Sequence, residues 1–181
     1  MGRLQQETMS EADMRANVLA PIRALEIPKD ELVVVGGAAL QAHGIRLARD
    51  IDVVVTPERL EQLLEETDRL PRRKRELGHL GAQLVMRRPD IGRVLADNGE
   101  YGITKGDITW MPAPNDKYYR ATFAELHDEA VDMGGVLVSP LSRILAWKQA
   151  LLGKPFRDKD RTDVRLIEQR WQETETPPVR P

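Results

Sequence analysis

The sequence predicts an α/β protein, built as one globular domain to which a smaller helical segment is attached. Two continuous apolar runs, 32–35 and 51–55, are typical of buried strands, and an amphipathic repeat after residue 140 is typical of a helix. The chain has 181 residues, of which 41% are hydrophobic and 31% charged, so it is long enough and apolar enough to bury a sizeable core.

The N-terminal region predicts a helix. Ser10, followed three residues later by Asp13, is a typical helix N-cap. Apolar residues then recur at helical spacing, at Met14, Val18, Ile22 and Leu25. Pro21 is expected to kink or divide this helix, and Pro28 is expected to end it.

The segment 32–55 predicts two strands around a glycine turn. Gly36 and Gly37 close the first strand and are expected to turn the chain into a helix at 38–43. Asp50 and Asp52 open the second strand, which is apolar on both faces beyond them and is therefore expected to lie centrally in the sheet. Because side chains alternate along a strand, both carboxylates are expected on one face.

The middle of the chain predicts helices and short strands in alternation. Thr56 and Pro57 begin a helix to about Leu70, and the basic run 72–75 opens another through Leu84. Turn signals between 85 and 110 indicate short strands, the last of which begins at Asp107. The expected elements that follow are a helix at 123–130 capped by Thr122 and a hairpin at 131–138 that turns at Gly134-Gly135.

The C-terminal part predicts two helices. Ser139-Pro140 caps the first, whose apolar stripe is Leu141, Ile144, Leu145 and Leu152, and which Gly153 and Pro155 end. The second runs from about Asp158 to Trp171. The expected organisation is therefore a core at 1–138, a helical segment at 139–171 and a disordered, proline-rich tail at 172–181.

Lys148 lies on that apolar stripe, where an apolar residue is expected. A buried ammonium needs a partner, and two are available. One is a bound triphosphate. The other is a structural role, in which the lysine snorkels or pairs with Asp160 on the next helix. By contrast, Arg157, Lys159 and Arg161 are expected to be solvated.

Composition excludes several classes of protein. The net charge of −2 argues against a generally basic duplex-binding surface, and an aromatic content of 4% does not indicate stacking on single strands. The basic run 72–75 leaves a nucleic-acid contact open, with a solvated face as its ordinary reading. No cysteine and no long apolar run are present, so we expect a cytoplasmic protein without a membrane span.

The acids and glycines together predict a site for a divalent cation beside a polyanion. Magnesium prefers oxygen ligands and commonly bridges carboxylates to phosphates, and glycine lets backbone N–H groups approach phosphate oxygens closely. A third acid would allow two ions to be held, and Asp107 is the best candidate because it also begins a strand. The structural alternative is a solvated strand end and an ordinary turn.

These residues resemble the signature of the nucleotidyltransferase superfamily with the DNA polymerase β-like fold: Gly36-Gly37, twelve residues, then Asp50-Ile51-Asp52. The intervening His43-Gly44 and Arg46 are similar to a minimal bacterial branch that includes the AbiEii-type toxins. Ala48 departs from that branch, which usually has Thr or Ser there. The C-terminal half also resembles AbiEii-like proteins, in the residues Ser139-Pro140-Leu141, Lys148, Arg157, Lys159-Asp160 and Asp163.

The resemblance implies a nucleotidyltransferase-like mixed, mainly antiparallel sheet flanked by helices, followed by a C-terminal helical segment. It implies transfer of a nucleoside monophosphate from a nucleoside triphosphate with Mg²⁺ or Mn²⁺, to an RNA such as tRNA or to a protein, by the toxin of a toxin–antitoxin pair with its antitoxin partner. The implied roles are metal binding and catalysis for Asp50, Asp52 and Asp107, and nucleotide binding for Gly36, Gly37, Arg46 and Lys148. The alternative is a catalytically silent module of the same fold that binds a nucleotide or a protein.

Overall fold

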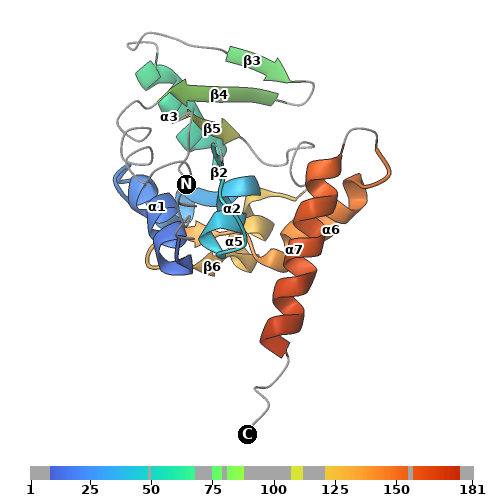
Figure 1. The fold of residues 1–181 in the computed structure, drawn as a ribbon. Helices are drawn as coiled ribbons and strands as arrows, with labels where there is room; N and C mark the ends of the chain where they lie inside the picture. The colour runs from blue at the N-terminus through green and yellow to red at the C-terminus, as the bar shows by residue number, and fades with distance from the viewer. Residues whose placement is uncertain are drawn as a thin grey trace, which may run out of the picture.

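A mixed β-sheet forms the centre of the protein in the computed structural model, which describes residues 9–48, 50–67, 75–78, 81–87, 107–111, 121–154 and 157–175 (Figure 1). Within these residues seven strands form one sheet in the order β3-β4-β5-β2-β1-β7-β6. The strands are β1 Leu32–Val35, β2 Ile51–Val55, β3 Arg75–Gly78, β4 Gly81–Arg87, β5 Asp107–Met111, β6 Val131–Asp132 and β7 Leu137–Val138.

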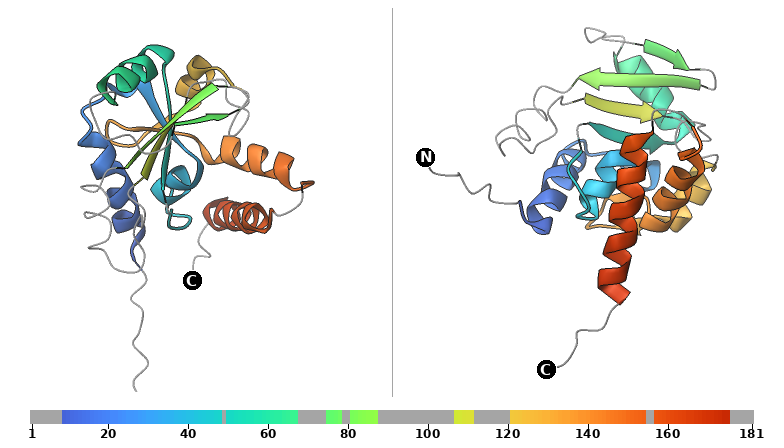
Figure 2. Two further views of the ribbon diagram at one scale, coloured as in Figure 1. Left: turned by 90° about the horizontal axis from the view of Figure 1, so that it is seen from above. Right: turned by 45° about the vertical axis from the view of Figure 1, so that its right-hand side comes forward.

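Helices cover both faces of this sheet (Figure 2). They are α1 Glu11–Arg23, the short 3₁₀ helix η1 Lys29–Glu31, α2 Gly36–Ala42, α3 Pro57–Thr67, α5 Phe123–Glu129, α6 Leu141–Leu151 and α7 Asp158–Glu175. No helix in the described ranges is both long and apolar enough to cross a bilayer.

The alternation of side chains along β1 and β2 divides the core in two. Ile51, Val53 and Val55 of β2 face a large cluster that also contains buried residues of α1, α2, α3, α6 and α7. Val54 and its neighbours Val33 and Val35 face a second cluster with Leu126 of α5. Burying a valine or leucine fully is worth about 1.5–3 kcal/mol, so these two clusters hold β1 and β2 rigidly between layers of helices.

The pairing of the strands confirms the expected sheet. β2 is the fourth of the seven strands, with β1 antiparallel on one side and β5 parallel on the other. The remaining pairs are antiparallel except β1 with β7, so the sheet is mixed and mainly antiparallel, and two helices follow it, as predicted.

Several local predictions are also confirmed. Ser10 caps α1, with its Oγ accepting from the Asp13 N–H at 3.1 Å. Thr122 and Glu125 form a capping box at the start of α5. The hairpin of β6 and β7 turns at Gly134 and Gly135, which both have positive φ.

Two boundaries in the N-terminal half differ from the prediction. Helix α1 contains Pro21 without being divided there and ends at Arg23, before Pro28; Glu26, with φ of 54°, turns the chain after the helix end. Helix α2 begins at Gly36 rather than at Ala38, so the glycine pair forms the first turn of the helix instead of a separate turn.

The helix predicted from residue 72 to Leu84 is wrong. Residues 75–78 and 81–87 form the antiparallel strands β3 and β4, and β4 pairs in turn with β5. Pairing with a strand already in the sheet overrides the helix propensity of Arg, Lys, Glu and Leu. Residues 72–74 lie outside the described residues, so the contact of the basic run with nucleic acid stays a prediction.

Helix α7 is longer than predicted and runs four residues beyond Trp171, to Glu175. The first part of the expected disordered tail is therefore helical, and residues 176–181 lie outside the described residues. The C-terminal part of α7 extends past the other helices and strands (Figure 1). Arg170 pairs with Glu11 at 2.7 Å and so fastens α7 to the start of α1.

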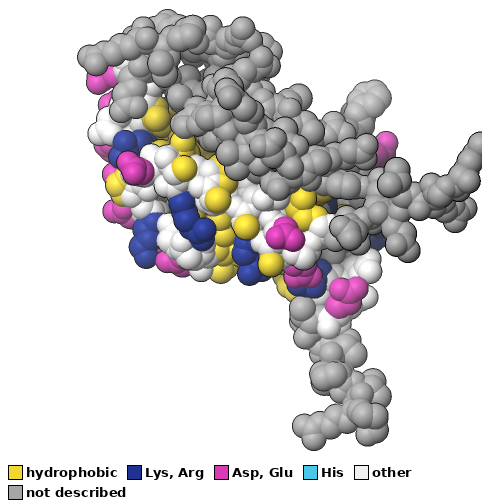
Figure 3. Space-filling view, turned by 60° about the vertical axis from the view of Figure 1, so that its left-hand side comes forward, with side chains coloured by type: hydrophobic (Ala, Val, Ile, Leu, Met, Phe, Trp, Pro, Cys, Tyr) yellow, Lys and Arg dark blue, Asp and Glu magenta, His cyan; other side chains and the backbone are white. Residues whose placement is uncertain are grey.

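Charge is distributed evenly over the face on which α1 lies. Described basic and acidic side chains alternate there with apolar ones rather than forming a field of one sign (Figure 3). Pairs such as Lys29 with Asp132, at 3.1 Å, neutralise neighbouring charges. The described part of this face therefore does not have the basic stripe that is typical of duplex binding.

Candidate functional site

Two carboxylates lie at the start of the central strand, beside the glycine turn. Asp52 is the second residue of β2 and is 6% exposed, and Asp50, directly before the strand, is half-buried. The register of β1 and β2 pairs Asp52 with Val35, the residue that precedes Gly36. The sheet thus brings the acid motif next to the glycine motif, although they are separated in the sequence.

The structure requires glycine at position 36 but not at position 37. Gly36 has φ of 61°, in the left-handed region that favours glycine, so the entry into α2 needs glycine at this position. A Cβ added to Gly37 would lie 3.7 Å from Ala48 Cβ and from two guanidinium nitrogens of Arg46, which is ordinary contact. Glycine at position 37 is therefore not required by packing.

The loop that leads to the acids is held by buried polar groups. The side chain of Gln41 is fully buried; its Oε1 accepts from the Ala48 N–H at 2.7 Å and its Nε2 donates to the Met14 carbonyl at 3.0 Å. The Nε2 of His43 lies 2.9 Å from the Ser139 carbonyl oxygen. Burial lowers the pKa of His43, although this hydrogen bond opposes the effect, so neutral imidazole is favoured.

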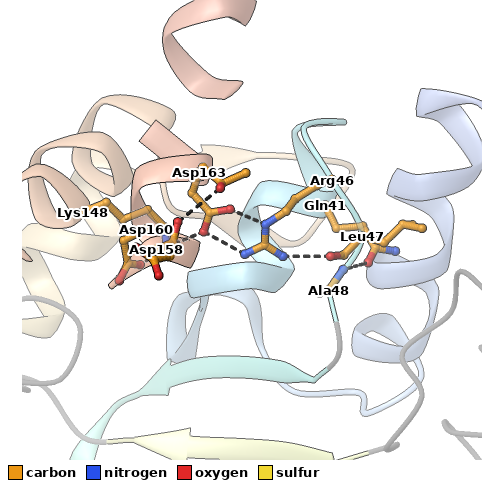
Figure 4. Close-up of polar contacts among 9 residues, drawn as sticks. Gln41, Arg46, Leu47, Ala48, Lys148, Asp158, Asp160 and Asp163 are labelled. Carbon is orange, nitrogen blue, oxygen red and sulfur yellow. Dashed lines mark hydrogen bonds and ion pairs between the residues drawn. The ribbon is translucent and has the colours of Figure 1, made fainter. Parts of the chain in front are cut away.

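Arg46 joins this loop to the C-terminal helices (Figure 4). Its guanidinium donates to both carboxylate oxygens of Asp163 in α7, through Nε and, at 2.9 Å, through Nη2. Nη1 donates to the Leu47 carbonyl at 2.8 Å. A bidentate arginine–carboxylate pair fixes orientation as well as distance, so the guanidinium is held beside Gly37.

Lys148 is buried at 3% exposure and bonded to two carboxylates of α7. Its Nζ lies 2.8 Å from Asp160 and 2.6 Å from Asp163. The pairing with Asp160, one of the two interpretations of this lysine, is therefore confirmed. Arg157 also pairs with Asp160, at 2.5 Å. Contact of Lys148 with a nucleotide stays a prediction.

Arg46, Lys148, Arg157, Asp160 and Asp163 form an ion cluster, and Asp163 lies at its centre. Burial raises the pKa of its carboxyl group, but hydrogen bonds from Arg46 and Lys148 outweigh burial and keep the pKa below its ordinary value of 3.8. Asp163 is fully buried and ionised at neutral pH, so it ties the loop before the acids to α6 and α7.

Asp107 is placed only through its backbone. It is the first residue of β5, and its successor Ile108 pairs with Ile51 in parallel register. Its backbone therefore lies alongside the backbone at Asp50. Among the described side chains no set of three histidines, aspartates or glutamates is grouped to hold a metal ion, and the side chain of Asp107 lies outside that set.

No protein-family model matches the chain, and no curated protein matches it. Among solved structures, the "Crystal Structure of ANT(2")-Ia in complex with adenylyl-2"-tobramycin" is similar. The TM-score is 0.48 at 21% sequence identity, over 87% of this chain and 88% of that one. Similarity at this level assigns neither a substrate nor a reaction to this protein.

Gln41 was not singled out from the sequence. It fastens the loop, and its signal was a polar residue within the apolar run 38–42. Asp163 was named only as part of the resemblance, and its bond to an arginine 117 residues away is a contact that no local pattern predicts. Arg161 is exposed as expected, whereas Arg157 is half-buried against Asp160.

Proposed function

We propose that this protein is a metal-dependent nucleotidyltransferase that moves a nucleoside monophosphate from a nucleoside triphosphate to an acceptor hydroxyl. The observation that carries the proposal is the pairing of Asp52 with Val35, which brings the start of β2, where Asp50 and Asp52 lie, next to the backbone that leads into Gly36 and Gly37. The cation of Arg46 lies beside the same glycines. The acids proposed to bind a metal and the half-buried backbone of Gly37 therefore lie at the same end of β1 and β2.

Asp50 and Asp52 fit a divalent cation. Asp52 is buried and Asp50 is half-buried, and the two carboxylates, one residue apart, would offer Mg²⁺ or Mn²⁺ the oxygen ligands that these ions prefer. Such an ion would supply neutralisation of the phosphate charge. We assign Asp107, whose backbone lies alongside Asp50, as the third acid of the site.

The reaction needs few groups because positioning and charge neutralisation supply most of its rate. The acceptor oxygen forms a bond to the α-phosphorus of the triphosphate, and the bond from that phosphorus to the bridging oxygen breaks, so pyrophosphate leaves. A carboxylate takes the proton of the acceptor hydroxyl, and Asp107 is our candidate. Gly36 and Gly37 offer backbone N–H groups to the phosphates.

The acceptor we propose is an RNA, tRNA in particular, or a protein, with the chain acting as the toxin of a toxin–antitoxin pair. This part of the proposal is supported by the sequence resemblance to AbiEii-type toxins, to which His43, Gly44 and Arg46 contribute. The test is transfer of label from each of four α-labelled nucleoside triphosphates to bacterial RNA and to protein, with and without Mg²⁺. We expect label on one acceptor class, only with metal; absence of label on both contradicts the proposal.

Gly37→Ala separates a role in binding from a role in folding. The added methyl group meets only ordinary contacts, and alanine is favoured over glycine in a helix, so we expect thermal stability to stay the same or rise. The methyl group also stands between the backbone and an approaching phosphate, and we expect the KM for the triphosphate to rise about tenfold, the equivalent of one lost hydrogen bond to a charged group.

The control for Gly37→Ala is Gly36→Ala, which places a Cβ at φ of 61° and should lower stability by about 1–2 kcal/mol. Unfolding of both variants is followed by circular dichroism, and KM is measured by the transfer assay. An unchanged KM in a folded Gly37→Ala protein would count against a phosphate seat at this backbone.

A second candidate function is a catalytically silent module of the same fold that binds a nucleotide or a protein. Ala48 favours it, because this position departs from the pattern of the active branch. Calorimetric titration of nucleoside triphosphate with and without Mg²⁺ discriminates the two. A silent module is indicated by triphosphate binding without transfer, or by binding that does not depend on the metal.

A further inference from the structure

The ion cluster between the loop and the C-terminal helices is not neutral. Its members within the described part of the chain are the cations Arg46, Lys148, Arg157 and Lys159 and the carboxylates Asp160 and Asp163, and the charge of Asp50 also acts on Lys159. With Asp50 counted, cations exceed carboxylates by one. The buried Lys148 is compensated by two carboxylates, so the excess positive charge lies at the exposed edge of the cluster, where an anionic ligand can approach it.

The pairing within the cluster identifies where the surplus is available. Lys148 is enclosed by Asp160 and Asp163, and Arg46 is held by both oxygens of Asp163. Lys159 is exposed, and no hydrogen bond or ion pair links it to any other residue in the described ranges. Its ammonium is therefore the cation of the cluster that is free to meet a ligand.

The position of Lys159 on α7 directs it to the candidate site. Residues four apart share a helix face, so Lys159 lies on the face of Asp163, which holds Arg46 beside Gly37. Burial is the largest cause that lowers the pKa of Lys159. The positive charges of Arg46 and Lys148 lower this pKa further, and the negative charges of Asp163 and Asp50 raise it. Lys159 thus lies within electrostatic reach of both Arg46 and the first acid.

We propose that Lys159 binds the polyphosphate of the nucleotide. This assignment rests on the proposed function and adds its substrate-facing cation, while Lys148 acts as a structural cation beneath it. Negative phosphates would then lie between a metal on Asp50 and Asp52 and the ammonium of α7. The surplus charge of the cluster would be compensated only when the substrate is bound.

If Lys159 binds substrate, removing its charge should stabilise the protein without ligand. If Lys159 formed a structural salt bridge, the same change should destabilise it. Because the fold lowers the pKa of Lys159, the folded state disfavours its charged form, and removing the charge should stabilise the protein without ligand. Lys159→Met keeps most of the side-chain stem and removes the ammonium. We expect its Tm to rise by about 1–3 °C.

The test is calorimetric titration of the full-length protein with the four nucleoside triphosphates and the corresponding monophosphates in Mg²⁺. We expect Lys159→Met to weaken triphosphate binding about tenfold or more, the usual loss for a charge-assisted hydrogen bond, and to change monophosphate binding much less. Lys159→Arg should restore most of the affinity. Lys154→Met, which removes an exposed lysine from the turn after α6, should match wild type.

Each outcome addresses one proposal. Triphosphate binding by Lys159→Met equal to that of wild type overturns the assignment of Lys159, and so does a fall in Tm with equal losses for both nucleotide classes, which would indicate a structural role. Wild-type protein that binds triphosphate but transfers no label contradicts the proposed reaction and leaves Lys159 as a binding residue. Wild type that binds no triphosphate overturns both.

Discussion

Asp52→Asn should abolish nucleotidyl transfer while leaving the fold intact. The amide has the shape of the carboxylate, so the buried position at the start of β2 is still filled. It cannot supply the negative charge that a divalent cation needs. Metal ions contribute several kcal/mol of transition-state stabilisation, so we expect kcat/KM to fall about a thousandfold or more.

Stability provides a second measurement for the same variant. With Mg²⁺, wild type should be stabilised by ligand linkage, about 2.7 kcal/mol at a hundredfold excess over Kd, and the variant should not. Differential scanning fluorimetry over a magnesium series measures this difference.

The matched control is Asp30→Asn, which neutralises an exposed aspartate of η1, away from the acid motif. Transfer and the response to magnesium should both stay at the wild-type level. If Asp52→Asn keeps more than about a tenth of the wild-type kcat/KM, when removal of a metal ligand should cost far more, the metal site lies elsewhere.

The strands of the site could be predicted from the sequence because their signals are local. Continuous apolar runs, a glycine pair and alternating acids are enough to predict β1 and β2, and the burial of both faces predicts a central β2. The antiparallel register that places Asp52 opposite Val35 could not be predicted in the same way, because helix α2 and a loop, residues 36–50, separate the two strands. The acids and glycines were assigned to one site from their residue types and order along the chain.

The parts of the fold and of the candidate site that could not be predicted from the sequence depend on contacts between distant segments. Strands β3 and β4 have helix-forming sequence and become strands only by pairing with β5. The burial of Lys148 could be inferred from the stripe of α6, but the sequence left its partner undecided between a substrate and Asp160. The bond from Arg46 to Asp163 joins residues 117 positions apart, and only the packing of α7 against the core brings them together.

Asp163→Asn should have the largest effect on stability of any substitution in the ion cluster. Asp163 is fully buried and bonded to both Arg46 and Lys148, so its neutralisation leaves two cations undercompensated. Removing one partner of a buried pair typically costs 3–5 kcal/mol, and because Arg46 is partly exposed we expect about 3 kcal/mol. Urea unfolding at pH 7 measures the loss. The matched control Asp158→Asn, at an exposed pair, should change stability by less than about 0.5 kcal/mol.

The same variant predicts how stability depends on pH. Because the pKa of Asp163 is lowered in the folded protein, its contribution is fully present above the unfolded value of 3.8 and is lost as the pH falls through the folded pKa. The difference in unfolding free energy between wild type and Asp163→Asn should therefore be constant from neutral pH to about pH 5 and shrink below pH 4, where the unfolded carboxyl has already bound its proton. A difference that stays constant down to pH 2 would mean that Asp163 stabilises the fold through its shape rather than its charge. In that case Arg46 would not depend on this carboxylate for its position beside Gly37.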